Sequence, residues 1–143
     1  MNTILAAIDN SPAAARALQT AMALASKCRA RLRILTVASR PTDDVVNEMR
    51  RVEDVTLDEM AKEAARDVML RAEESVNRPD DIEVGHEFAI GEPISQILAA
   101  AERNHADMIV VGKRGHSQLK GLVIGSVSQG LVSRASCPVL VVP

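Results

Sequence analysis

Aromatic residues and cysteines are scarce in this chain of 143 residues. Tryptophan and tyrosine are absent, and Phe88 is the one aromatic residue. The core must therefore be built from aliphatic side chains, and the chain offers no stacking platform for the bases of a single-stranded nucleic acid. The two cysteines, Cys28 and Cys137, form no Cys-x-x-Cys pair. This pattern argues against a zinc site and favours reduced thiols in a cytoplasmic protein.

Long apolar runs and an excess of positive charge are lacking as well. No apolar run approaches the roughly 18 residues that cross a membrane, and residues 1–8 carry no basic leader, so we expect neither a membrane span nor a signal peptide. The 17 Lys and Arg residues are balanced by 19 Asp and Glu residues. That balance argues against a dedicated nucleic-acid binder, which would need an excess of basic residues. The length fits one domain, which we assign to residues 1–143.

The charges that are present are unevenly distributed. Residues 1–40 hold six basic groups and one acidic group, and residues 103–143 hold five basic groups and one acidic group. Residues 41–81, in contrast, hold thirteen acidic and six basic groups. If the two ends of the chain meet in space, we expect them to form a mildly positive site that suits small anions.

Five short apolar segments alternate with segments of helical periodicity. The apolar segments predict strands at residues 3–8, 32–37, 82–88, 107–111 and 138–142. Ser11 and Pro12 predict the start of the first helix, as a cap residue followed by proline at the first helical position. Three further helices are predicted: one within residues 41–77, one that begins at residue 93, and one over residues 126–134. The apolar residues predicted on the inner faces of the first two are Leu57, Ala61, Ala64, Val68 and Ala72, and Ile94, Ile97, Leu98 and Ala101.

Strands that alternate with helices at this spacing predict parallel pairing through right-handed crossovers. The expected fold class is therefore α/β, an open, doubly wound, Rossmann-like sheet of five parallel strands. Such sheets bind ligands beyond the carboxyl ends of their strands, where the winding reverses. The residues expected there are Asp9, Asn10 and Ser11 after the first strand and those from Gly112 onward after the fourth.

A glycine-rich segment between the fourth strand and the last helix carries the main chemical signal. It runs Gly112-Lys113-Arg114-Gly115 and, nine residues later, Gly125-Ser126. Ser126 with Gln129 matches a Ser-x-x-Gln capping box, and the first turn of a helix presents free N–H groups to an anion. Gly125 would let the backbone approach a ligand, and Ser126 and Ser128 add hydroxyl donors. The segment therefore predicts a phosphate cradle.

The same glycines also fit ordinary punctuation of a loop between strand and helix, with the serines acting only as caps. Gly112 and Gly115 would permit a tight turn against a flat ligand, and Lys113, Arg114 and Lys120 would neutralise phosphates. The segment is neither a Walker A sequence nor a Gly-x-Gly-x-x-Gly dinucleotide fingerprint.

The pattern Gly-x2-Gly-x9-Gly-Ser, between a Val-Val-Gly strand end and a terminal Pro-Val-Leu-Val-Val strand, resembles the universal stress protein family over the whole chain. The resemblance implies the strand order 3-2-1-4-5, homodimers paired through the last strand, Val139–Val142, and, in the branch that keeps these glycines, ATP binding. Asp9 would lie near the ribose or a metal, and the backbone of Val37 near the adenine edge. The nucleotide-binding residues implied are Ala7, Asp9, Val37, Gly112, Lys113, Arg114, Gly115, Gly125, Ser126, Val127 and Ser128.

We therefore expect a cytoplasmic, homodimeric ATP-binding protein that acts as a regulatory or sensor module toward a protein partner. Mg²⁺ would be held largely by the phosphates, with Asp9 as at most one contact. No catalytic residue is predicted. The alternatives are slow ATP hydrolysis or autophosphorylation at Ser126 or Ser128, and a structural dimer that holds no nucleotide.

Overall fold

The structure is a computed structural model that describes residues 1–38, 57–115 and 124–143. Five strands form one sheet: β1 (Thr3–Ile8), β2 (Arg31–Ala38), β3 (Val84–Ile90), β4 (Met108–Gly112) and β5 (Val139–Val142). Four helices alternate with them: α1 (Pro12–Cys28), α3 (Leu57–Glu74), α4 (Pro93–Arg103) and α5 (Ser126–Arg134). None of the helices in these ranges has the length and apolar character needed to cross a membrane.

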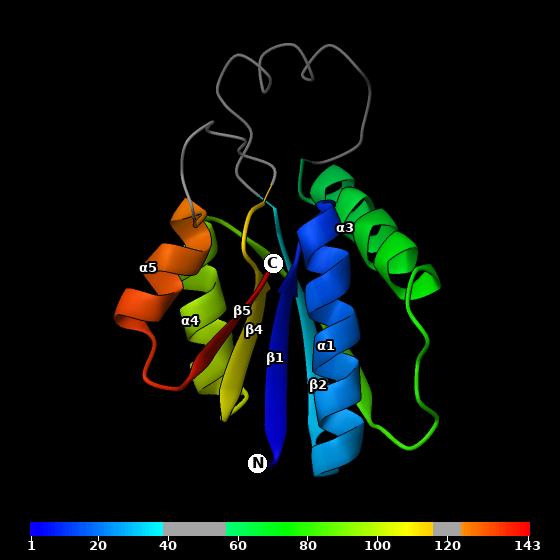
Figure 1. Ribbon diagram of the computed structural model, residues 1–143. Coiled ribbons are helices and arrows are strands. Elements are labelled where there is room, and N and C mark those ends of the chain that lie inside the picture. Colours follow the sequence, from blue (N-terminus) through cyan, green and yellow to red (C-terminus); the bar gives the residue numbers. More distant parts are fainter. Residues whose placement is uncertain (39–56, 116–123) are drawn as a thin grey trace.

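The sheet is parallel throughout and has the order β3-β2-β1-β4-β5, which confirms the predicted topology. Helices α1 and α3 cover one face, and α4 and α5 cover the other (Figure 1). The chain winds outward from β1 to β3 and then returns to place β4 on the other side of β1. The winding therefore reverses between β1 and β4, whose carboxyl ends lie at the same edge of the sheet.

Two aliphatic cores on opposite faces explain the uninterrupted apolar runs of the strands. Along β1, Ile4 and Ala6 pack toward α1, whereas Leu5 packs toward α4 and α5. Ile109 and Val110 divide in the same way along β4. Since every strand residue of this kind is buried on one face or the other, an alternating polar pattern is not needed. Each fully buried Leu or Ile contributes about 1.5–3 kcal/mol through the apolar surface that it removes from water.

Several predicted boundaries differ from those observed. β1 and α5 have the predicted bounds, whereas β3 begins and ends two residues later, at Val84 and Ile90. On α3 the buried side chains include Ala65 and Ala72, and the predicted inner-face residue Ala64 is exposed. The helix is therefore rotated by about one residue from the predicted face at that point. Residues 41–56 of the predicted polar segment lie outside the described residues.

Helix α1 ends on a non-glycine residue in a left-handed backbone conformation. Arg29 has φ 52° and ψ 41°, and its N–H donates to the carbonyl of Ser26 at 3.1 Å. Glycine adopts this conformation readily because it has no Cβ, whereas the Cβ of any other residue comes too close to the following carbonyl oxygen. We expect Arg29→Gly to raise the free energy of unfolding by about 0.5–1 kcal/mol, because relief of the left-handed strain exceeds the added backbone entropy of glycine.

Urea unfolding at neutral pH measures this change. Lys27→Gly, within the last turn of the same helix, is the matched control and is expected to lower the free energy by about 1 kcal/mol. If Arg29→Gly and Lys27→Gly lower the free energy of unfolding equally, the proposed strain at the Arg29 cap is contradicted.

Candidate functional site

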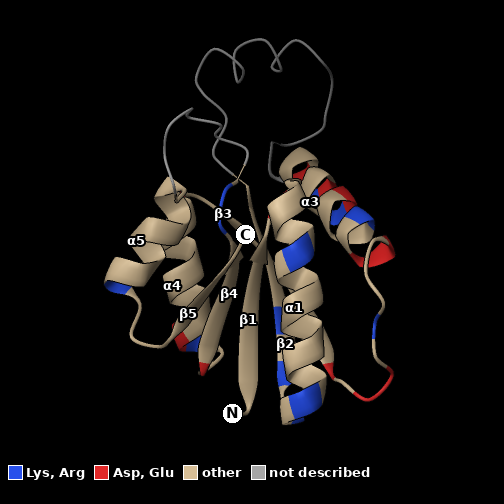
Figure 2. Ribbon diagram, viewed as in Figure 1, with Lys and Arg blue, Asp and Glu red and all other residues tan. Residues whose placement is uncertain are grey.

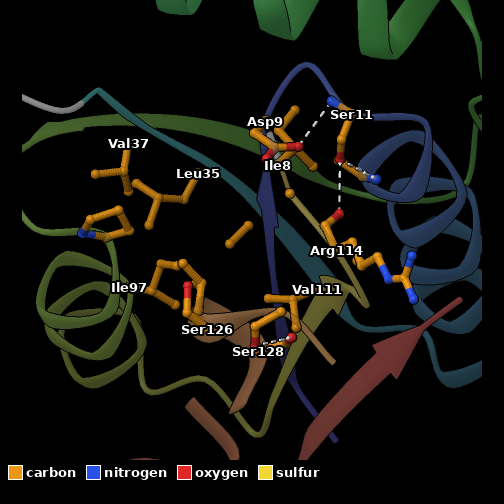
Figure 3. A pocket seen from close by; sticks show the side chains of 17 residues that line it. Ile8, Asp9, Ser11, Leu35, Val37, Ile97, Val111, Arg114, Ser126 and Ser128 are labelled. Atoms are coloured by element: carbon orange, nitrogen blue, oxygen red, sulfur yellow. Dashed lines mark hydrogen bonds between the residues drawn. The ribbon is translucent and has the colours of Figure 1, made fainter. Parts of the chain in front are cut away.

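A cavity of about 320 Å³ lies where the winding of the sheet reverses, at the carboxyl ends of β1, β2 and β4 (Figure 3). Its size is within the usual range for small-molecule sites. One side is apolar and is formed by Leu35 and Val37 from β2 together with Pro93 and Ile97 from α4. The other side is polar and combines Asp9 and Ser11, the exit of β4 and the start of α5; its residues include Arg114, Gly115, Gly125, Ser126, Val127 and Ser128.

Ten of the eleven residues predicted for the site line this cavity. The exception is Lys113, whose side chain is not part of the lining. The apolar side, in contrast, was largely missed, because Pro93 and Ile97 were interpreted only as the start and the inner face of a helix. The usable signal was that α4 begins at the same edge of the sheet as the glycine-rich segment. Lys120, which is predicted to neutralise phosphates, lies outside the described residues.

The N-termini of three helices meet at the cavity, and two of them are capped by their own side chains. The Ser11 hydroxyl accepts from the N–H of Ala14 at 3.2 Å at the start of α1. The Glu92 carboxylate accepts from the N–H groups of Ile94 and Ser95, at 3.0 and 2.8 Å, at the start of α4. Both helix starts therefore carry a side-chain cap from within the chain.

Helix α5 begins differently, and the predicted capping box is wrong. Gly125, not Ser126, occupies the cap position in an extended conformation, with φ −72° and ψ 156°, and supplies no side-chain oxygen. Ser126 is the first helical residue and is exposed. Within the described ranges, the N–H groups of Ser126, Val127 and Ser128 have no acceptor. These unsatisfied donors line the cavity together with the positive end of the helix dipole.

The exit of β4 is fixed by the backbone of Lys113. Its N–H donates to the carbonyl of Val142 at 2.6 Å, which extends the ladder between β4 and β5. Its carbonyl accepts from the N–H of Gly125 at 2.8 Å and from the hydroxyl of Ser128 at 3.1 Å. Lys113 therefore joins strand and helix through its main chain.

The tip of β1 is held against the segment that follows β4. Ser11 donates its hydroxyl to the carbonyl of Arg114 at 3.3 Å, and the Asp9 carboxylate accepts from the N–H of Ser11 at 2.9 Å. A Cβ at Gly115 would lie 2.6 Å from Oδ2 of Asp9. Glycine at position 115 thus lets the Asp9 carboxylate lie directly against the backbone of the glycine-rich segment.

Gly112 and Gly125 pack closely against other segments of the protein. A Cβ at Gly112 would lie 2.8 Å from the carbonyl carbon of Ala13 in α1. A Cβ at Gly125 would lie 3.0 Å from the carbonyl oxygen of Lys113. Close packing of the segments that frame the cavity is therefore a second reason for glycine at these positions, beside the predicted approach of a ligand.

The predicted positive site is not found in the described part of the cavity. Its charged lining residues there are Asp9 and Arg114, one of each sign. Arg31 and Arg33 lie at the opposite end of β2, and Lys27 lies at the far end of α1 (Figure 2). The ends of the chain do meet in the sheet, but most of their basic side chains do not meet at the site.

A resident metal ion has no ligand set in the part of the chain that the structure describes. No group of three or more His, Cys, Asp and Glu side chains is close enough there to hold one. Asp9 fits a cation only as a single carboxylate ligand, with the remaining ligands supplied by phosphate oxygens and water, as Mg²⁺ accepts.

Capping of α4 makes Glu92 sensitive to acid. Hydrogen bonds from Ser95 and Ile94 hold the pKa of this carboxyl below its ordinary value of 4.5. A carboxyl with a lower pKa in the folded state stabilises the fold above the unfolded-state pKa, and that stabilisation is lost as the pH falls through the folded-state pKa. We expect the free energy of unfolding to fall less between about pH 5 and pH 2 in Glu92→Gln than in the unmodified chain.

Chemical unfolding across that pH range tests the expectation. Glu102→Gln, at the other end of the same helix, is the matched control. If the free energy of unfolding depends on pH in the same way in Glu92→Gln and in the unmodified chain, the role of the Glu92 cap is contradicted.

The sequence profile of the universal stress protein family matches residues 1–143. The universal stress protein YxiE of Bacillus subtilis is 34% identical to the chain over 145 residues, covering 99% of the chain and 98% of that protein. Among solved structures, universal stress protein UspA from Lactobacillus plantarum superposes with a TM-score of 0.80 at 26% identity, covering 99% and 97% of the two chains.

Two further structures of similar fold contain nucleotides. A universal stress protein in complex with cAMP has a TM-score of 0.69 at 24% identity and covers 99% of this chain and 97% of its own. The universal stress protein from Archaeoglobus fulgidus in complex with dAMP has a TM-score of 0.65 at 20% identity and covers 100% and 98%. At these identities, the similarity establishes the fold.

Proposed function

The chain belongs to the universal stress protein family, and from this membership and the geometry of the cavity we propose that it is an ATP-binding regulatory module. The observation that carries the proposal is the first turn of α5. It has no side-chain cap, whereas the two other helix starts at the cavity are capped by Ser11 and Glu92. A phosphate group supplies the oxygen acceptors and the negative charge that such a helix start binds.

The shape of the cavity suits a nucleoside attached to that phosphate. The aliphatic side, formed by Leu35, Val37, Pro93 and Ile97, offers apolar contact to a flat base. The polar side begins at Asp9, whose carboxylate oxygens suit the hydroxyl groups of a ribose. The presence of cAMP and dAMP in two proteins of this fold is consistent with a nucleotide ligand.

Within this proposal ATP is taken up together with Mg²⁺. Arg114 is the one cationic side chain that lines the described part of the cavity, and it does not balance the full charge of a triphosphate. The Mg²⁺ ion would neutralise the remaining phosphate charge. Asp9 would provide one oxygen ligand at most.

We extend the proposal to a homodimer formed through β5. The two edges of the sheet differ in character. On β3, His86 pairs with Glu73 at 2.7 Å and Glu87 pairs with Arg103 at 3.2 Å, and charged edges of this kind disfavour pairing with a second sheet. The four residues of β5 are all aliphatic and half-buried. An apolar edge suits a second copy related by a two-fold axis.

The regulatory action in this proposal is occupancy of the cavity. ATP would bridge the start of α5 and the tip of β1, and a protein partner would respond to the surface formed when both are held. We assign this activity to the cytoplasm, where free cysteines such as the exposed Cys28 stay reduced.

The test is to purify the protein without added nucleotide, denature it, and separate any released small molecules by chromatography. We expect adenine nucleotide, with ATP as the main component. If the released fraction contains none, and ATP added to the refolded protein does not bind in a calorimetric titration, the proposal is wrong.

A further inference from the structure

The hydroxyl of Ser128 is buried and already engaged within the protein. The residue is 3% exposed, although it lies in the first turn of a helix at the cavity. Its hydroxyl donates to the carbonyl of Lys113 at 3.1 Å and to that of Gly125 at 3.0 Å. Ser126, two residues earlier, is exposed at the same cavity. The two serines of the glycine-rich motif therefore occupy different environments.

The chemistry of a hydroxyl group limits what Ser128 can offer to a phosphate. A serine hydroxyl has one proton to donate and otherwise only lone pairs. In Ser128 that proton is shared between two carbonyl oxygens, so the hydroxyl can form a further hydrogen bond only as an acceptor. A phosphate oxygen is itself an acceptor, and two acceptors do not form a hydrogen bond. Direct binding of phosphate by this side chain would require the two internal contacts to break.

Those internal contacts connect the two segments that frame the polar side of the cavity. The Lys113 carbonyl receives both the N–H of Gly125 and the hydroxyl of Ser128, which fills its two lone pairs. The Ser128 hydroxyl thus fixes the first turn of α5 to the exit of β4. It also fixes the direction of the N–H groups of Ser126 and Val127, which lie between the two anchored positions.

We propose that the side chain of Ser128 has a positioning role: its hydroxyl holds the open start of α5 in the orientation that binds phosphate and does not itself contact the ligand, whereas the backbone N–H of Ser128 stays available to the phosphate. This inference rests on the proposed nucleotide function. Ser126 takes the other role, as the exposed hydroxyl that meets the ligand.

Three alanine variants separate these roles. Ser128→Ala removes the internal contact, Ser126→Ala removes the exposed hydroxyl, and Ser133→Ala is the matched control. Ser133 donates to the carbonyl of Gln129 at 3.0 Å in the same helix and is not part of the cavity lining. Ser128→Thr keeps the hydroxyl and serves as the rescue variant. Loss of the Ser128 hydroxyl leaves the Lys113 carbonyl paired with Gly125, so the fold is expected to survive.

The first readout is amide hydrogen exchange of Gly125, measured by NMR in protein stripped of nucleotide. We expect exchange to be about tenfold faster in Ser128→Ala, because the loss of one hydrogen bond loosens the joint. Exchange is expected to be unchanged in Ser126→Ala and Ser133→Ala and restored in Ser128→Thr. A side chain that acts only by touching the ligand would leave exchange unchanged in the nucleotide-free state.

The second readout is the affinity for AMP and for adenosine. We expect Ser128→Ala to weaken AMP binding about tenfold and to leave adenosine binding within about twofold, since only the phosphate subsite is misaligned. Weaker AMP binding with unchanged Gly125 exchange would overturn the inference in favour of direct contact, and no change in either readout would overturn it outright. If the unmodified protein binds neither AMP, ATP nor adenosine, the proposed function itself fails.

Discussion

Replacing Gly125 with valine is expected to weaken ATP binding by about a hundredfold or more. A Cβ at this position lies 3.0 Å from the Lys113 carbonyl oxygen and 3.4 Å from Cα of Arg114. Valine therefore forces the start of α5 away from the exit of β4, and two or more hydrogen bonds to a charged phosphate are lost, each contributing about 1.5–3 kcal/mol. The backbone of Gly125, with φ −72° and ψ 156°, suits any residue, so the effect is steric rather than conformational.

Calorimetric titration of ATP into the nucleotide-free variant measures the loss. Gly125→Ala is the graded control, since it adds the Cβ alone, and its affinity is expected to lie between those of glycine and valine. Circular dichroism and the mass in solution should stay unchanged in both. An ATP affinity in Gly125→Val equal to that of the unmodified chain would refute the assignment of the phosphate site.

Replacing Val141 with proline is expected to convert the proposed homodimer into monomers. Ile109 donates to the carbonyl of Pro138, and Lys113 donates to that of Val142. In a parallel ladder, residues 138, 140 and 142 therefore direct their polar groups toward β4, and residues 139 and 141 direct theirs outward. Proline at 141 removes an outward N–H group and leaves the ladder to β4 intact.

The mass of the protein in solution, measured by light scattering across a range of concentrations, is the readout. Val84→Pro is the matched control on the opposite edge of the sheet. The N–H of Leu32 donates to the carbonyl of Glu83, so Glu83 directs its polar groups toward β2 and Val84 directs its own outward. We expect the control to remain dimeric. A dimer that persists in Val141→Pro, or an unmodified chain that is monomeric, would contradict pairing through β5.

The main features of the fold could be predicted from the sequence because they follow from local patterns. The aliphatic runs identified the strands, and Ser11 with Pro12 identified the start of α1 at the observed residue. The family resemblance supplied the strand order, which the structure confirms. Boundaries of the exposed β3 were less accurate, because half-buried residues carry a weak periodic signal.

The site was predicted less completely, since it depends on which segments meet in space. The Ser-x-x-Gln pattern at Ser126 matched a capping box, but the glycine before it takes the cap position and leaves the amides open. Lys113 is predicted to act through its charge, whereas the contacts that it makes in the structure come from its main chain. Pro93 and Ile97 line the cavity only because α4 packs against β2 and β1 on that face of the sheet, which no local pattern encodes.

Chemical-shift mapping of backbone amides during a titration with ATP tests the role of the α5 start most directly. The account predicts that the largest changes fall on Ser126, Val127 and Ser128, the amides that lack an acceptor in the described structure. Saturable binding that shifts other amides and leaves these three in place would contradict it.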